Sequence, residues 1–77
     1  MNTITIDTCG MRCPMPLLKT KLQLNEMKPG DQLEVVSDDP GSARDIPAYL
    51  NLTVHELEQA DESEGLFRFL IRCGDSH

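Results

Sequence analysis

The sequence predicts an α+β fold, a two-layer α/β sandwich in which two helices cover one face of a four-stranded mixed sheet. Three observations support it. Residues 3–7 form an alternating β-branched run, two later segments begin with an acceptor residue followed by proline, and two apolar runs close the chain around an acidic segment. The resulting order, βαβαββ, implies a parallel strand pair with a right-handed crossover and a final antiparallel hairpin.

The first helix is expected to follow the N-terminal strand and a short loop. It begins at Pro14, because proline suits the first helical turn, and continues to about Lys28, where Pro29-Gly30 ends it. Four residues with 3-4-3 spacing should face the sheet: Leu17, Thr20, Leu24 and Met27. Leu18 and Leu22 lie to one side of this stripe, and we expect them to pack against the second helix, with a partner surface as the alternative.

The remaining elements are read in the same way. Residues 32–37 form a strand, and Asp39 caps a second helix that begins at Pro40 and continues to about Leu50. Pro47 lies inside this helix, where it removes a hydrogen bond and favours a kink. Residues 53–59 and 66–73 are expected to be strands, and the acidic residues 60–65 to connect them as a hairpin.

Composition limits the classes of function. The 77 residues make one domain, 1–77, and a net charge of −6 disfavours direct nucleic-acid binding. No apolar run approaches the roughly 20 residues that span a membrane, and the N-terminus lacks the pattern of a secretory signal. An odd number of cysteines, three, argues against a disulfide framework. We therefore expect a cytoplasmic protein in a reducing compartment, and a monomer.

The most informative motif is Cys13-Pro14-Met15-Pro16 at the start of the first helix. The proline after it makes Cys13 the predicted N-cap, where unpaired backbone N–H groups and the helix dipole favour an anion. At the start of the second helix, the same position is held by a carboxylate, Asp39. A sulfur caps poorly unless it is ionised, so the pattern predicts a reactive thiolate at Cys13.

The charge is distributed unevenly along the chain. Residues 8–28 carry four basic residues and one acidic residue, a net charge of +3, which leaves −9 for the remainder of the chain. Arg12 directly precedes the cysteine. Nearby cations favour the thiolate and could steer an acidic partner to this end of the molecule.

Residues 7–16, Asp-Thr-Cys-Gly-Met-Arg-Cys-Pro-Met-Pro, resemble the signature of the TusA/SirA family of small sulfur carriers. The resemblance extends over essentially the whole chain, in order and with similar spacing. It includes three later segments: Asp38-Asp39-Pro40, Arg44-Asp45-Ile46-Pro47 and Phe69-Leu70-Ile71-Arg72. It implies the same sandwich fold and accounts for Pro47 as a feature of the family.

The resemblance implies that Cys13 accepts sulfane sulfur as a persulfide from a cysteine desulfurase or a rhodanese-like donor. The sulfur then passes to a downstream acceptor protein, so the chain would be a carrier in a sulfur relay and not a stand-alone enzyme, with no cofactor. In TusA the relay ends in 2-thiouridine of tRNA; other members serve sulfur oxidation or molybdenum-cofactor synthesis. Supporting positions are Pro14, Pro16, Arg12 and Cys9.

Two other functions remain open from the residues. The first is a redox switch through a Cys9–Cys13 disulfide. The second is a metal-binding module that uses Cys9 and Cys13 with Cys73 or His77, although this spacing matches no standard zinc pattern. Cys73 is more simply a core residue, and neither His55 nor His77 has the spacing of a Cys/His catalytic pair.

Asp45 is a further polar residue of the motif segments. It is expected to have a structural role, as the ion-pair partner of Arg44 or Arg12.

Overall fold

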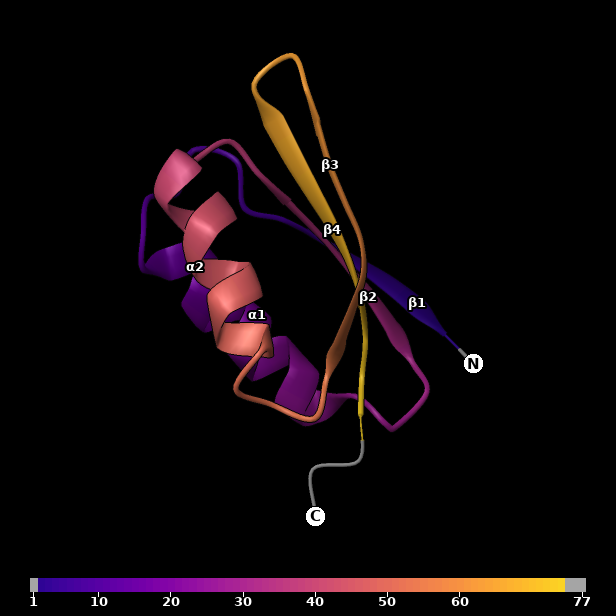
Figure 1. The fold of residues 1–77 in the computed structure, drawn as a ribbon. Helices are drawn as coiled ribbons and strands as arrows, with labels where there is room; N and C mark the ends of the chain where they lie inside the picture. The colour runs from indigo at the N-terminus through magenta and orange to yellow at the C-terminus, as the bar shows by residue number, and fades with distance from the viewer. Residues whose placement is uncertain (1, 75–77) are drawn as a thin grey trace.

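The computed structural model describes residues 2–74 and shows the predicted α+β sandwich (Figure 1). The first three elements are strand β1 (Thr3–Asp7), helix α1 (Met15–Glu26) and strand β2 (Gln32–Ser37). They are followed by helix α2 (Pro40–Leu50) and by strands β3 (Glu56–Ser63) and β4 (Leu66–Arg72). The predicted element order is therefore confirmed.

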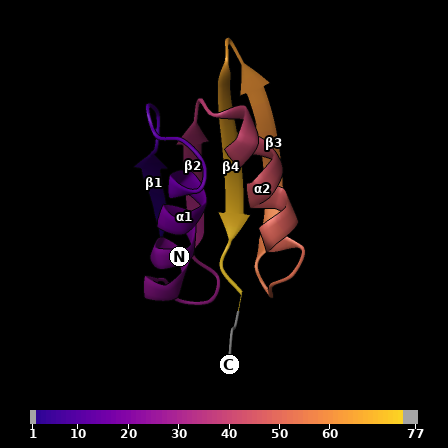
Figure 2. The ribbon, with the colours of Figure 1, turned by 90° about the vertical axis from the view of Figure 1, so that its left-hand side faces the viewer.

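The four strands form one mixed sheet in the order β1-β2-β4-β3. β1 and β2 are parallel, whereas β4 runs antiparallel to both of its neighbours. Both helices lie on the same face of the sheet, with α1 over β1 and β2 and α2 over β4 and β3 (Figure 2). Because β1 and β2 are parallel, the crossover through α1 places their C-terminal ends at the same end of the sheet.

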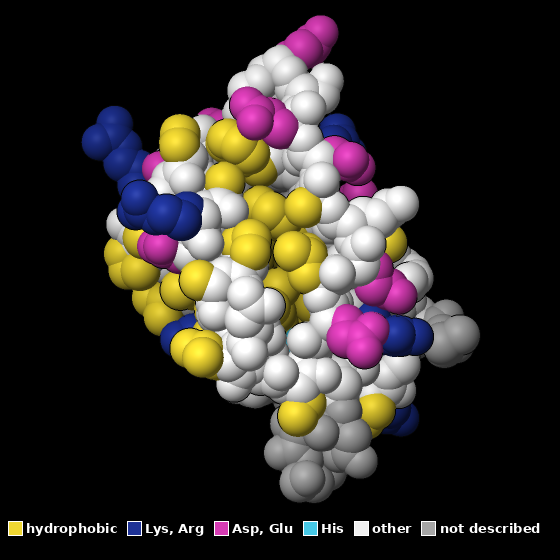
Figure 3. Space-filling view, in the orientation of Figure 1, with side chains coloured by type: hydrophobic (Ala, Val, Ile, Leu, Met, Phe, Trp, Pro, Cys, Tyr) yellow, Lys and Arg dark blue, Asp and Glu magenta, His cyan; other side chains and the backbone are white. Residues whose placement is uncertain are grey.

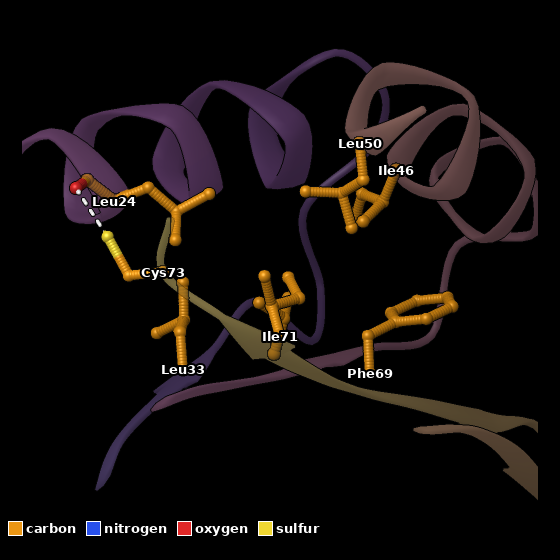
Figure 4. Packing of buried hydrophobic residues seen from close by; sticks show 8 residues of the cluster. Leu24, Leu33, Ile46, Leu50, Phe69, Ile71 and Cys73 are labelled. Atoms are coloured by element: carbon orange, nitrogen blue, oxygen red, sulfur yellow. Dashed lines mark hydrogen bonds between the residues drawn. The ribbon is translucent and has the colours of Figure 1, made fainter. Parts of the chain in front are cut away.

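The core lies between the helices and the two central strands. Alternate residues of β2 face the helices, and their cross-strand partners on β4 do the same: Leu33 pairs with Ile71, and Val35 with Phe69. The helices contribute Leu24, Ile46 and Leu50 (Figure 4). Cys73 is buried in this cluster, and its sulfur lies 3.7 Å from the carbonyl oxygen of Leu24. This aliphatic layer is what the period-2 and 3-4-3 patterns predicted.

Leu18 and Leu22 are left largely exposed, which does not agree with the expected packing against α2. Their side chains are 41% and 65% exposed. The side of α1 that meets α2 instead carries Lys21, whose Nζ lies 4.7 Å from the centre of the Tyr49 ring. A cation–π contact allows the long side chain of Lys21 to cover the junction between α1 and α2, and the two leucines face outward.

The acidic segment is a strand and not the predicted connection. β3 begins at Glu56 and extends to Ser63, so the hairpin turn contains only Glu64 and Gly65, both with positive φ (53° and 79°). A two-residue turn of this hand matches the twist of the flanking strands. Strand β3 is one of the two edge strands of the sheet, where charged side chains oppose pairing with another chain. Its acidic residues are visible on the hairpin in Figure 3.

Helix α2 agrees with its predicted bounds. Asp39 is its N-cap, Pro40 is its first residue, and Pro47 lies inside it without ending it before Leu50. Helix α1 is slightly shorter than predicted and ends at Glu26. Among the described residues, neither helix has the length and apolar character that crossing a bilayer requires.

Candidate functional site

The loop between β1 and α1 carries Cys13 and lies beside the start of α2 (Figure 1). Thr8 anchors the loop, because its backbone N–H and its hydroxyl both donate to the carbonyl oxygen of Val36, at 2.8 and 2.6 Å. Gly10 makes the turn with φ of +84°, a conformation that favours glycine. Its N–H donates to Asp38 at 3.0 Å. The loop is thus tied to the segment that connects β2 to α2.

One carboxylate oxygen joins the cysteine loop to α2. Asp39 Oδ2 accepts hydrogen bonds from Cys13 N–H at 2.9 Å, from Ser42 N–H at 3.1 Å and from the Ser42 hydroxyl at 2.9 Å. These hydrogen bonds lower the pKa of Asp39, and the one from the Cys13 N–H contributes most. The predicted N-cap of α2 is confirmed, and the same atom also positions the backbone of Cys13.

The thiol of Cys13 points toward a second carboxylate of α2. Its side chain is exposed, and Sγ donates to Asp45 Oδ2 at 2.9 Å. This hydrogen bond is the largest cause of a raised pKa for Cys13, to which the negative charges of Asp45 and Asp39 add, while Arg44 acts in the opposite direction. The free thiol is therefore stabilised in its protonated form.

The predicted N-cap role of Cys13 was wrong. Helix α1 begins at Met15, Pro14 occupies the N-cap position, and no side chain caps the helix. Cys13 lies one residue before the N-cap, and its sulfur contacts Asp45 instead of the free N–H groups of the first turn. The expected lowering of the Cys13 pKa by the helix terminus is consequently replaced by a rise.

Replacing Asp39 by alanine is expected to lower the midpoint of thermal unfolding by about 5 °C or more, because α2 loses its cap and the buried Ser42 loses a partner. Circular dichroism on heating measures this. Asp39→Asn is the matched control, since asparagine caps as well as aspartate and retains an oxygen acceptor. Equal losses in both variants would show that the charge, and not the shared acceptor, matters.

The structure places the other predicted site residues around this loop. Pro14 is exposed, and Pro16 is a buried residue in the first turn of α1. Arg12 is exposed and lines a shallow pocket of about 350 Å³ together with Asp38 and Asp39. Cys9 is also exposed, and a hydrogen bond with Asp7 is the main cause of its raised pKa. Arg12 and Cys9 thus lie in the same loop as Cys13, whose sulfur hydrogen-bonds to Asp45 instead.

The remaining candidates have structural surroundings. Cys73 is buried in the core, and burial raises its pKa. His55 Nδ1 accepts from the Gly74 N–H at 2.9 Å, and burial lowers the pKa of the imidazole. Within residues 2–74, no group of three or more histidine, cysteine or acidic side chains is arranged to hold a metal ion. His77, the other candidate ligand, lies outside the described residues.

Sequence reasoning missed two roles at this site. It identified Asp39 as a cap but not as the acceptor for Cys13, and it assigned Asp45 only to an ion pair. That pair exists, since Arg44 Nε lies 3.7 Å from Asp45 Oδ1, but the Arg44 side chain is 83% exposed and the pair is weak. The available signal was that Asp39 and Asp45 belong to motif segments that accompany the cysteine motif.

Comparisons with known proteins agree with this arrangement. The family model described as sulfurtransferase TusA matches residues 4–73. Among solved structures, the crystal structure of a SirA-like protein from Desulfitobacterium hafniense is similar, with a TM-score of 0.80 and 26% sequence identity. The match covers 94% of this chain and 99% of that one. The two-layer fold is therefore that of a known sulfur-transfer family.

Proposed function

Since this chain belongs to the TusA sulfurtransferase family, we propose that it is a sulfur carrier that accepts sulfane sulfur on Cys13 as a persulfide and passes it to an acceptor protein. The observation that carries the proposal is the exposed thiol of Cys13. Its loop is fixed by hydrogen bonds on both sides, through Thr8 to β2 and through Asp39 to α2. A carrier needs this combination of an accessible sulfur and a defined position.

The chemistry requires no outside oxidant. In loading, the Cys13 thiolate attacks the outer sulfur of a donor persulfide, a new S–S bond forms, and the donor S–S bond breaks to release the donor thiolate. In delivery, the acceptor thiolate attacks the outer sulfur of the Cys13 persulfide, and Cys13 leaves as the thiolate. The proton lost from the attacking thiol is taken up by the released thiolate, so each transfer conserves atoms and electrons.

The surroundings of Cys13 suit a protein partner better than a small substrate. The sulfur is exposed, and the neighbouring pocket of about 350 Å³ is open to solvent and includes the charged residues Arg12, Asp38 and Asp39 in its lining. Side chains of both signs lie near the sulfur, namely Arg44 and the carboxylates of Asp39 and Asp45, and acidic side chains occupy the tip of the hairpin (Figure 3). Transfer between proteins needs only that two sulfurs meet, so a flat and accessible site is sufficient.

We assign the partners by the chemistry of the transfer. The donor is a cysteine desulfurase or a rhodanese-like protein, and the acceptor is a protein with a reactive cysteine, in a relay that serves tRNA thiolation or sulfur oxidation. The overall charge of −6 favours delivery to a protein over direct contact with tRNA. Three free thiols on a monomeric carrier suit a reducing compartment, the cytoplasm.

The test is sulfur loading followed by mass spectrometry. The protein is incubated with a cysteine desulfurase and cysteine without reductant, and peptides are then analysed. We expect one added sulfur atom on the peptide that contains Cys13. A loss of two hydrogens that links Cys9 to Cys13, with no sulfur gained from either class of donor, would contradict the carrier and favour the redox switch.

A further inference from the structure

Two carboxylates of α2 face Cys13, and they contact different parts of it. Asp39 Oδ2 already accepts three hydrogen bonds, including the one from the Cys13 backbone. Asp45 alone accepts from the sulfur, at 2.9 Å. The sulfur of buried Cys73, by comparison, lies 3.6 to 3.9 Å from neutral carbonyl oxygens. The shorter contact at Asp45 is typical of a charge-assisted hydrogen bond.

A carboxylate at this distance stabilises a thiol and opposes a thiolate. The S–H group donates to Asp45 Oδ2, and removal of that proton would leave two negative charges 2.9 Å apart. The charged groups that act on the sulfur from α2 are Asp45 and Asp39, which disfavour ionisation, and Arg44, which favours it. Arg12 precedes Cys13 on its own loop. The balance favours the neutral thiol in the free protein.

We propose that Asp45 keeps Cys13 weakly reactive in the free protein by holding its sulfur as a protonated thiol directed toward α2. Cys13 becomes a strong nucleophile only when the charge of Asp45 is offset. Arg44 offsets this charge in part, because its Nε lies 3.7 Å from Asp45 Oδ1. Asp45 is thus a positioning residue for sulfur transfer. The inference rests on the proposed function for its biological meaning, but the protonation of Cys13 can be measured without any sulfur donor.

Keeping Cys13 protonated has a chemical use in a carrier. A free thiolate exposed to solvent reacts with oxidants and electrophiles, whereas a thiol reacts slowly. A sulfur donor that places a cation near Asp45 during docking would release the thiolate only in the complex. Loading also removes the ionisable proton from Sγ, because the persulfide carries it on the outer sulfur, so the thiol–Asp45 hydrogen bond exists only in the unloaded carrier.

The experiment is the alkylation rate of Cys13 by iodoacetamide, followed on the Cys13 peptide from about pH 5 to pH 10, because only the thiolate reacts. Asp45→Asn is expected to move the midpoint of this profile to lower pH and to raise the rate at neutral pH at least about threefold. Arg44→Gln should move the midpoint in the opposite direction. The two variants change charge with opposite signs, so a general loss of folding cannot mimic both.

Glu26→Gln is the matched control. It removes one negative charge, as Asp45→Asn does, but at the far end of α1, so that at about 1.5 Å per residue its charge is well beyond the screening length. Its profile should equal that of the parent protein. An unchanged midpoint in Asp45→Asn would show that Asp45 is only structural, and a slower alkylation would show that it acts as a base. Either result contradicts the proposal that Asp45 suppresses the reactivity of Cys13. Failure of sulfur loading alone would instead contradict the carrier function.

Discussion

Replacing Cys13 by serine is expected to abolish sulfur loading while leaving the fold intact. Each transfer needs a thiolate nucleophile that can form an S–S bond, and a serine hydroxyl is not ionised at neutral pH. The fold should survive because the Cys13 side chain is exposed. A hydroxyl can donate to Asp45 as the thiol does, and the backbone hydrogen bond from residue 13 to Asp39 does not involve the side chain.

Intact mass after incubation with a desulfurase measures loading, and thermal unfolding measures the fold. Cys9→Ser is the matched control, because Cys9 is an exposed thiol four residues earlier in the same loop. It should load one sulfur atom as the parent protein does. A Cys13→Ser variant that still gains sulfur, or a Cys9→Ser variant that gains none, would move the carrier role away from Cys13.

Replacing Leu24 by alanine is expected to reduce the free energy of unfolding by about 3 kcal/mol, the usual cost of removing a buried leucine side chain. Leu24 is 2% exposed and belongs to the cluster that joins α1 to β2 and β4. A domain of 77 residues has a total stability of roughly 4–12 kcal/mol. The substitution therefore removes a large share of the stability, because a small core has few other contacts to compensate.

Leu22→Ala tests the same change two residues earlier on the same helix. Leu22 is 65% exposed, so we expect a change within about 0.5 kcal/mol. Both variants exchange leucine for alanine, which removes helix propensity as an explanation of the difference. Urea unfolding with unchanged slope gives both values. Similar losses in the two variants would mean that Leu22 is covered in solution, as the sequence had suggested.

Local signals predicted the elements that depend on neighbouring residues. The alternation in β2 and the aspartate–proline start of α2 were both correct to the residue. These signals act over distances of four residues or fewer, because backbone hydrogen bonds, caps and side-chain periodicity are set within a helical turn or a strand repeat. The same holds for the burial of Thr20 and Leu24 on one face of α1.

The expectations that failed depended on what lies opposite an element. The acidic residues were read as a connection because they are polar, but an edge strand can be polar along its whole length when its partner supplies the pairing. Asp61 lies opposite Arg68, and Ser63 opposite Leu66, on β4. Likewise, the side of α1 that faces α2 carries Lys21, which lies over the Tyr49 ring, while Leu18 stays exposed.

The sequence by itself determined the fold class and the family, because each follows from local patterns or from a motif that can be read in order, and it singled out Cys13 as the candidate sulfur. The tertiary structure decided which charged groups surround that sulfur. Asp39 lies 26 residues from Cys13 and Asp45 lies 32 residues from it, yet both reach it across the junction of α1 and α2. The pKa of a thiol depends on charges within a few ångströms in space, so only the packing of α2 against the loop could reverse the ionisation that the helix start had suggested.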